Sequence, residues 1–263
     1  MIRVGVFGAG GRMGMTVCQA VCDDPNLELT AAVDPHHVGI DVRQLGIRGG
    51  AIQVARTADA LAEAGAEVAV DFTVIDAARE NLAWCAKNGV HAVVGTSGFS
   101  MDEVERFGAA FEGSGANVAI VPNFAISAVL MMKFAELAAP YFDTAEIIEL
   151  HHDDKIDAPS GTAIATAERM ADASDQWFPD PTTKMVLEGA RGGAGAGGIP
   201  IHSVRLRGLV AHQEVLLGTT GQTLTIRQDS YDRTSYMPGV LRAIKAIGNK
   251  PGLTFGLDAL LGL

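Results

Sequence analysis

Short apolar runs alternate with stretches of helical composition through the first half of the chain. The apolar runs predict strands at residues 2–7, 27–33, 68–72, 89–95 and 118–121, and helices are predicted at 15–22 and 77–87. Strands and helices that alternate at this spacing form a parallel sheet with crossover helices on its faces. The sequence therefore predicts an α/β domain with a Rossmann-type parallel sheet over residues 1–123.

The pattern changes after Asn123. A strand is predicted at residues 144–150, helices at 128–139 and 162–173, and then three strands with no helix between them at 201–206, 213–218 and 222–227. Consecutive strands favour an antiparallel or mixed sheet, so residues 124–238 are predicted as an α+β domain. Gly189–Gly198 holds six glycines and is predicted to be a mobile loop. A last helix at residues 239–248 could belong to either domain.

The charge balance of the chain is acidic, with 20 Lys and Arg against 31 Asp and Glu and a formal net charge of −11. A general nucleic-acid binder needs a basic face, so no nucleic-acid partner is predicted. Cys18, Cys22 and Cys85 form neither a disulfide framework nor a metal-ligand pattern and are predicted as small core residues. No signal-peptide pattern precedes the first strand, and proline, asparagine and lysine interrupt the most apolar stretch, residues 118–140. We therefore expect a cytoplasmic protein without a membrane partner.

A glycine-rich turn directly follows the first predicted strand and precedes a predicted helix. Gly8, Gly11 and Gly14 fit G-x-x-G-x-x-G rather than the strict G-x-G-x-x-G. Glycine lets the backbone turn tightly and approach a pyrophosphate, and the helix start offers free N–H groups. Asp34 ends the second strand 20 residues beyond Gly14, where an acid accepts hydrogen bonds from an adenosine ribose. An ordinary tight turn is the alternative, but this context favours a dinucleotide.

Two charged residues near this turn predict opposite cofactor preferences. Asp34 favours a free ribose 2′-hydroxyl and repels a 2′-phosphate, whereas Arg12 on the turn could pair with that phosphate. The use of both NADH and NADPH is therefore predicted. His36 and His37 follow Asp34 closely and are interpreted as solvated loop residues.

The chemistry of the chain is predicted to lie in one short segment with the sequence HHDDKIDAPSGT. A predicted strand runs into the paired imidazoles of His151 and His152, and Lys155 follows three residues later. Ser160 or Thr162 can cap the helix that follows. Two imidazoles, an ammonium group and a helix N-terminus together make an anion site with a titratable donor.

Two other kinds of site could use this segment. Paired histidines occur as zinc ligands, but no cysteine is near, and a lysine among the acids suits a metal poorly, so no metal site is predicted. The other alternative is a solvated polar loop, against which the Ser-Gly-Thr helix start argues.

These residues resemble those of bacterial dihydrodipicolinate reductases, also called 4-hydroxy-tetrahydrodipicolinate reductases, of lysine and diaminopimelate biosynthesis. The resemblance spans nearly the whole chain. Its anchors are Gly8–Gly14, Asp71–Thr73, Gly95–Phe99, Pro122–Phe124 and, above all, His151–Thr162. Residues 209–214 and 232–235 resemble the actinobacterial branch of the family.

The resemblance implies an NAD(P)H-dependent oxidoreductase with two domains, assembled as a homotetramer. Residues 239–263 would return to the dinucleotide-binding domain of residues 1–123, and residues 124–238 would bind substrate and form the oligomer. Hydride would pass to ring carbon C4 of 4-hydroxy-tetrahydrodipicolinate, a cyclic dicarboxylate, and water would be lost to give tetrahydrodipicolinate.

The resemblance also assigns roles to single residues. His151 and Lys155 correspond to the catalytic residues, with His151 as general acid and base. The residues expected to bind substrate are His152, Ser160, Gly161 and Thr162. The residues expected to bind the cofactor are Gly8, Gly10, Gly11, Arg12, Met13, Gly14, Asp34, Phe72, Thr73, Gly95, Thr96, Ser97, Pro122, Asn123 and Phe124.

The chain departs from the family's pattern in three places. Val74-Ile75 stand where a proline is common, which bears on loop shape, and Ser97 replaces the usual threonine. Asp153-Asp154 replace a basic or proline-containing pair, and they would bring two more negative charges beside Lys155 if they pointed inward. We expect them to face solvent.

Two alternative functions share the same scaffold. One is another NAD(P)-dependent imine or carbonyl reductase, and the other is a sensor that binds NAD(H) without catalysis. A semialdehyde dehydrogenase that works through a covalent intermediate needs a thiolate, and no cysteine lies in the second half of the chain. A sensor would have no reason to keep the full set of donors in the HHDDKIDAPSGT segment.

Overall fold

The protein divides into two compact units. The computed structural model describes residues 1–263, of which Met1–Phe124 and Tyr236–Leu263 form unit 1 and Ala125–Ser235 form unit 2. The boundaries thus fall after Phe124 and after Ser235, compared with the predicted 123 and 238. No helix is both long enough and apolar enough to cross a membrane.

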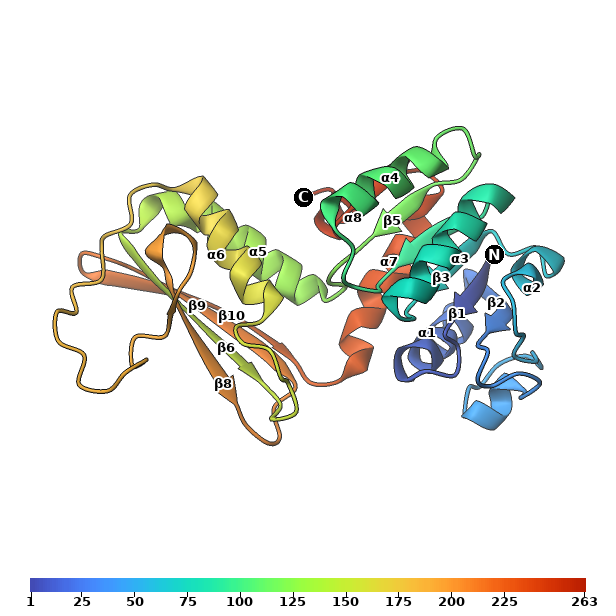
Figure 1. Ribbon diagram of the computed structural model, residues 1–263, viewed down its shortest axis with the longest axis horizontal. Helices are drawn as coiled ribbons and strands as arrows, with labels where there is room; N and C mark the ends of the chain where they lie inside the picture. Colours follow the sequence, from blue (N-terminus) through green and yellow to red (C-terminus); the bar gives the residue numbers. More distant parts are fainter. The chain divides into compact units, whose positions relative to one another are not determined.

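Unit 1 is built on a six-stranded sheet in which all neighbouring strands are parallel, in the order β11-β5-β4-β3-β1-β2 (Figure 1). The chain proceeds from β1 to β2 on one side and then to β3 on the other, so the winding reverses between β1 and β3. The predicted Rossmann-type parallel sheet is confirmed. The strands are β1 (Ile2–Phe7), β2 (Leu27–Val33), β3 (Val68–Asp71), β4 (His91–Val94), β5 (Val118–Ile120) and β11 (Leu253–Phe255).

Helices cover both faces of this sheet. All residues of β3 and of β5 are buried, and because successive side chains point to opposite faces, both faces must be covered. Helix α1 packs against α7, and α3 packs against α4. The helices of unit 1 are α1 (Arg12–Asp23), α2 (Asp59–Glu63), α3 (Ile75–Asn88), α4 (Met101–Phe111), α7 (Met237–Ile247) and α8 (Asp258–Leu261).

Four elements of unit 1 are absent from the prediction, namely α2, α4, α8 and β11. Three of them have five residues or fewer and bury only one residue each, so no continuous apolar run marks them, in contrast to the equally short but fully buried β3 and β5. Helix α4 did carry a signal, because Ser100 and Glu103 form a capping box at its start. The last helix, α7, lies in unit 1, which answers the question that the sequence left open.

Unit 2 consists of a mixed five-stranded sheet with its two α-helices on one face (Figure 1). The strand order is β10-β9-β6-β8-β7; β6 and β8 are parallel, and the other neighbours are antiparallel. This confirms the predicted α+β class. The elements are α5 (Ile126–Ala138), β6 (Thr144–His151), α6 (Gly161–Ala173), β7 (Gly193–Ala194), β8 (Pro200–Arg205), β9 (Ala211–Thr219) and β10 (Gln222–Ser230).

The glycine-rich stretch before β8 is more regular than predicted. Gly193–Ala194 form β7 and pair with β8, so the prediction of a loop throughout residues 189–198 is wrong for part of it. Glycine composition marked flexibility of the backbone but could not reveal a pairing with a strand several residues away. The short 3₁₀ helices of the chain lie at Val42–Leu45, Ala139–Tyr141, Ala196–Gly198 and Arg233–Tyr236.

Strand β6 places one acid in an otherwise apolar row. Ala145, Ile147 and Glu149 alternate along the strand and are 8%, 0% and 0% exposed. His151 continues the same row at the end of the strand, where it pairs in register with Arg205 of β8. A fully buried carboxylate needs partners to offset its desolvation, and these partners define the site described below.

Candidate active site

The residues predicted to bind the cofactor gather at one edge of the sheet of unit 1. Each group follows the carboxyl end of a parallel strand, and parallel strands bring these ends to the same edge. The turn after β1 touches the loop after β3, since a Cβ added to Gly8 would lie 3.1 Å from Thr73 Cγ2. The Phe72 ring lies against Gly95 and is 5.5 Å from the Phe124 ring, centroid to centroid.

The glycine turn has no room for side chains where it meets α1. A Cβ on Gly14 would lie 1.9 Å from the carbonyl oxygen of Gly8, and Gly8 itself has a φ of 70°, which favours glycine. Helix α1 begins after Gly11 without a side-chain cap, so its first N–H groups face the turn. This cradle fits a pyrophosphate, for which both glycine and a helix N-terminus are suited. Arg12 is exposed and Met13 half-buried beside it.

Asp34 is buried against the glycine turn. Its carboxylate accepts hydrogen bonds from the Gly10 N–H at 3.0 Å and the His36 N–H at 2.9 Å. Burial raises the pKa of Asp34, but these bonds and the nearby His37 ring outweigh it, so the pKa lies below the ordinary value. The prediction for His37 as a solvated residue is wrong, because its ring lies against Gly10, where an added Cβ would come within 2.2 Å of Nδ1.

A second buried acid, Asp71, fixes the loops after β3 and β4. One of its oxygens accepts hydrogen bonds from the Thr73 N–H at 2.8 Å, the Thr73 hydroxyl at 2.7 Å and the Thr96 hydroxyl at 2.9 Å. The other accepts from Asn81 at 2.7 Å. Two of the predicted cofactor residues, Thr73 and Thr96, are therefore held by one carboxylate. Ser97 and Pro122 are exposed, and Asn123 is half-buried, at the same edge.

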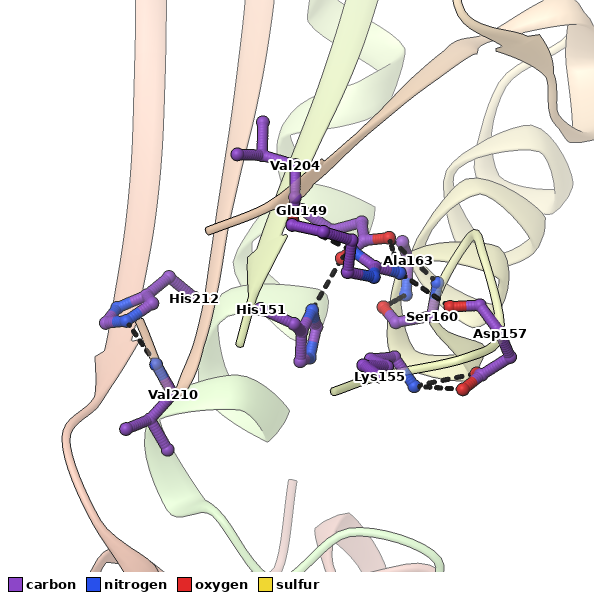
Figure 2. Close-up of polar contacts among 10 residues, drawn as sticks. Glu149, His151, Lys155, Asp157, Ser160, Ala163, Val204, Val210 and His212 are labelled. Atoms are coloured by element: carbon purple, nitrogen blue, oxygen red, sulfur yellow. Dashed lines mark hydrogen bonds and ion pairs between the residues drawn. The ribbon is translucent and has the colours of Figure 1, made fainter. Parts of the chain in front are cut away.

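His151 is held by a buried ion pair in unit 2 (Figure 2). Its Nδ1 lies 2.5 Å from one oxygen of Glu149. The guanidinium of Arg205 donates to both oxygens of Glu149, at 2.9 and 2.8 Å. Neither Glu149 nor Arg205 is among the residues predicted from the sequence. A signal for Glu149 existed, because a charged residue two positions before His151 must lie on the same face of a strand; Arg205 left none.

Charges around His151 set the ionisation of both members of the pair. Burial opposes ionisation of Glu149, but hydrogen bonds from Arg205 and His151 outweigh it, and the pKa of Glu149 lies below the ordinary value. Burial lowers the pKa of His151, the Glu149 carboxylate raises it, and the positive charges of Lys155 and Arg205 lower it. The net result for His151 is a pKa below the ordinary value, so the ring is neutral at neutral pH.

Lys155 lies in the turn that follows β6. The acid that it contacts is neither Asp153 nor Asp154. Its ammonium group donates to both oxygens of Asp157, at 2.8 and 2.7 Å. The hydrogen bond from Lys155 lowers the pKa of the exposed Asp157. Asp153 instead accepts from Arg207 at 2.8 Å, and both it and Asp154 are exposed, as expected.

Helix α6 begins beside the same ion pair. The Ser160 hydroxyl accepts a hydrogen bond from the Ala163 N–H at 3.2 Å, so Ser160 is the cap and not Thr162. The Ser160 N–H donates to Glu149 at 3.3 Å. Gly161 is exposed, and a Cβ there would meet nothing within 4 Å. The structure thus brings His151, Lys155 and the α6 N-terminus together, while His152 is exposed on the turn between them.

These features are typical of a nicotinamide-dependent oxidoreductase: a parallel sheet with a glycine-rich turn in one unit, and a histidine and a lysine beside a helix N-terminus in the other. The family models for the N-terminus and the C-terminus of dihydrodipicolinate reductase match residues 2–124 and 127–261. The chain belongs to the dihydrodipicolinate reductase family.

Individual relatives agree with this membership over their full length. Two curated proteins named 4-hydroxy-tetrahydrodipicolinate reductase cover all of this chain and of their own: that of Corynebacterium urealyticum is 48% identical and that of Mycobacterium marinum 49%. A solved dihydrodipicolinate reductase with bound dipicolinate, from Paenisporosarcina sp. TG-14, is 41% identical, with a TM-score of 0.86 and coverage of 98% of this chain and 99% of that one.

These findings confirm the predicted family and fold class. They also confirm the predicted activity, an NAD(P)H-dependent reduction of 4-hydroxy-tetrahydrodipicolinate in lysine and diaminopimelate biosynthesis. The cofactor is a nicotinamide dinucleotide.

Proposed function

We propose that His151 and Lys155 carry the proton transfers of the reduction of 4-hydroxy-tetrahydrodipicolinate. The observation that carries this proposal is the ion pair of the buried Glu149 with the half-buried Arg205, which holds the imidazole of His151 beside Lys155 and the start of α6. A general acid or base needs a fixed position and a pKa that its surroundings can tune. His151 has both.

The substrate of this reaction carries two carboxylates, and the solved relative binds dipicolinate, which is also a dicarboxylate. In a chain with a net charge of −11, a dianion needs a local source of positive potential. Lys155 and the N–H groups at the α6 N-terminus supply it. We assign one carboxylate to Gly161 and Thr162, with Ser160 as the cap that orders this turn, and the other substrate contacts to His152.

Each residue has a chemical task in this proposal. When bound, the nicotinamide would supply a hydride to ring carbon C4, and the hydroxyl on that carbon would take up a proton from the His151 and Lys155 pair to leave as water. His151 is neutral before substrate binds, and a neighbouring dianion favours its protonated form, so the ring can hold and return a proton. On substrate binding, Lys155 exchanges its contact with the Asp157 carboxylate for one with a substrate carboxylate. It then stabilises the negative charge that develops in the substrate ring.

We further propose that the cofactor is bound by the predicted residues at the carboxyl edge of the sheet in unit 1, and that both NADH and NADPH are used. The Asp34 carboxylate is placed for a ribose 2′-hydroxyl, which favours NADH. Arg12 is exposed beside it and is free to pair with a 2′-phosphate. The His37 ring is in contact with Asp34, with Nδ1 3.2 Å from a carboxylate oxygen.

The activity is tested with substrate made in situ from pyruvate and aspartate semialdehyde by a synthase, with cofactor absorbance as the readout. We expect oxidation of both NADH and NADPH. Arg12→Ala should raise KM for NADPH about tenfold and leave KM for NADH unchanged, because only the former carries the 2′-phosphate. Failure to oxidise either cofactor would contradict the proposed reaction, and equal changes in both KM values would contradict the role of Arg12.

Unit 2 is also proposed as the contact surface of a homotetramer. Both α-helices of the unit lie on one face of its sheet (Figure 1). The opposite face carries half-exposed apolar side chains from three strands: Ile148, Leu150, Val204 and Leu216. Apolar side chains on an uncovered sheet face favour association with further copies. Light scattering of the intact protein measures the assembly.

A further inference from the structure

Glu149 is the one charged side chain of unit 2 that is completely shielded from solvent, at 0% exposure. It does not reach the surface on which a substrate would lie. The removal of a carboxylate from water costs several kcal/mol, so its place in an apolar row has to be offset by specific partners. Its hydrogen-bond partners are His151, Arg205 and the backbone N–H of Ser160 at the start of α6.

The contacts of Glu149 decide which nitrogen of His151 carries the proton. Glu149 is ionised, because its pKa lies below the ordinary value, and it therefore accepts hydrogen bonds only. Its short contact of 2.5 Å is to Nδ1, so Nδ1 must be the donor. A neutral imidazole has one N–H, which leaves Nε2 with its lone pair.

Arg205 holds the carboxylate in this position. Its two terminal nitrogens each donate to a different oxygen of Glu149, a bidentate arrangement with a preferred geometry. One of them also donates to the carbonyl oxygen of Asp157 at 2.6 Å, in the turn that carries Lys155. The Ser160 N–H at the start of α6 completes the set at 3.3 Å. The ion pair thus ties together β6, β8, the lysine turn and α6.

We propose that Glu149 is the positioning residue of His151: held by Arg205, it fixes the proton of His151 on Nδ1 and reserves Nε2 for proton exchange with the bound substrate. The role rests on the function proposed for His151. It differs from a purely structural role because it concerns the tautomer and basicity of a ring and not only the stability of the sheet. Second partners of this kind orient the first ligand or base in many active sites.

The same strand offers a matched control. Glu146, three residues earlier, points to the opposite face of the sheet and also pairs with a histidine and an arginine, namely His202 at 2.5 Å and Arg191. This second cluster contains the same three residue types as the first. None of the contacts that define it involves His151, Lys155 or α6. Substitution there reports on the loss of an ion pair on the sheet face proposed as the oligomer contact, which is why the mass in solution is measured together with kcat.

The test compares Glu149→Gln with Glu146→Gln and with the wild-type chain. In Glu149→Gln the charge is removed and an amide nitrogen replaces one carboxylate oxygen; because both oxygens accept from Arg205, at least one of the Arg205 hydrogen bonds is lost whichever way the amide lies. We expect kcat to fall about 10²-fold while KM for substrate changes less than about threefold, because the effect lies in proton transfer. The affinity for NADH, measured by fluorescence titration, should be unchanged in both variants. Glu146→Gln should retain wild-type kcat at an unchanged mass in solution.

The pH profile separates positioning from stability. The groups that face His151 are Glu149, Lys155 and Arg205, and only the first of these raises its pKa. Glu149→Gln removes that contribution, so the midpoint that His151 gives to the rate profile should move down by about one pH unit. A loss of kcat with an unmoved midpoint, or wild-type kcat, would overturn the proposal.

A measurement on the wild-type chain covers the case in which the variant does not fold. The ¹⁵N spectrum of histidine-labelled protein, with His151 assigned by its loss in His151→Gln, should show a single tautomer protonated on Nδ1. A ring protonated on Nε2 would overturn the proposal. Because this spectrum needs no substrate, it distinguishes failure of the positioning role from failure of the proposed reaction, which the assay alone reports.

Discussion

Replacement of His151 with alanine should lower kcat by about 10²-fold or more, within the usual contribution of a positioned proton donor. The ring lies at the end of β6 with Nδ1 bound to Glu149, and no other imidazole in the segment is held by a buried carboxylate. The affinity for NADH should not change, because the predicted cofactor residues belong to unit 1. Steady-state kinetics in the synthase-coupled assay measure the first quantity, and fluorescence titration measures the second.

Two further variants sharpen this result. His151→Gln keeps an N–H that can donate to Glu149 but removes the titratable nitrogen, so it should lose as much activity as alanine with less effect on stability. His202→Gln is the matched control, because His202 contacts a glutamate of the same strand on the opposite face. Wild-type turnover in His151→Ala would refute the assigned role.

Lys155 is expected to contribute on the same scale. Lys155→Ala removes the ammonium group beside the helix N-terminus and should lower kcat by about 10²-fold. KM for substrate should also rise, since the same group attracts the dianion. If kcat stays at the wild-type value and only KM rises, Lys155 binds substrate but takes no part in the chemical step.

Gly14→Ala should both destabilise unit 1 and disrupt cofactor binding. The new Cβ would lie 1.9 Å from the Gly8 carbonyl oxygen, which is backbone and cannot rotate aside. Either α1 or the glycine turn must move, at a cost of about 3 kcal/mol in the free energy of unfolding. Since the same turn is proposed to hold the pyrophosphate, Kd for NADH should rise at least about tenfold. Urea unfolding and fluorescence titration measure the two effects.

The control for this variant is Gly50→Ala. Gly50 is exposed, its φ is not positive, and an added Cβ would meet nothing within 4 Å. Both the free energy of unfolding and the affinity for NADH should remain within error of the wild type. An equal loss of stability and of NADH affinity in both variants would contradict the prediction, because the close approach of backbone atoms exists only at Gly14.

The sequence predicted those parts of the fold that depend on local pattern. Continuous buried runs such as Val68–Asp71 were predicted as strands because they are covered on both faces, and the strand–turn–helix order around Gly8 predicted a dinucleotide-binding turn. The strand Leu253–Phe255 was missed because only one of its residues is buried and its position is set by a neighbouring strand. The pairing of Gly193–Ala194 with β8 escaped for the same reason.

For the site, the sequence by itself determined which groups lie together as candidates for the chemistry, because the HHDDKIDAPSGT segment is contiguous and its imidazoles, ammonium group and helix start lie within twelve residues. The tertiary structure alone decided how those groups are held. Arg205 reaches Glu149 from 56 residues further along the chain, through the parallel pairing of β6 and β8. A contact of that kind depends on register between strands, which no local pattern encodes, and it is this contact that holds the carboxylate proposed to position His151.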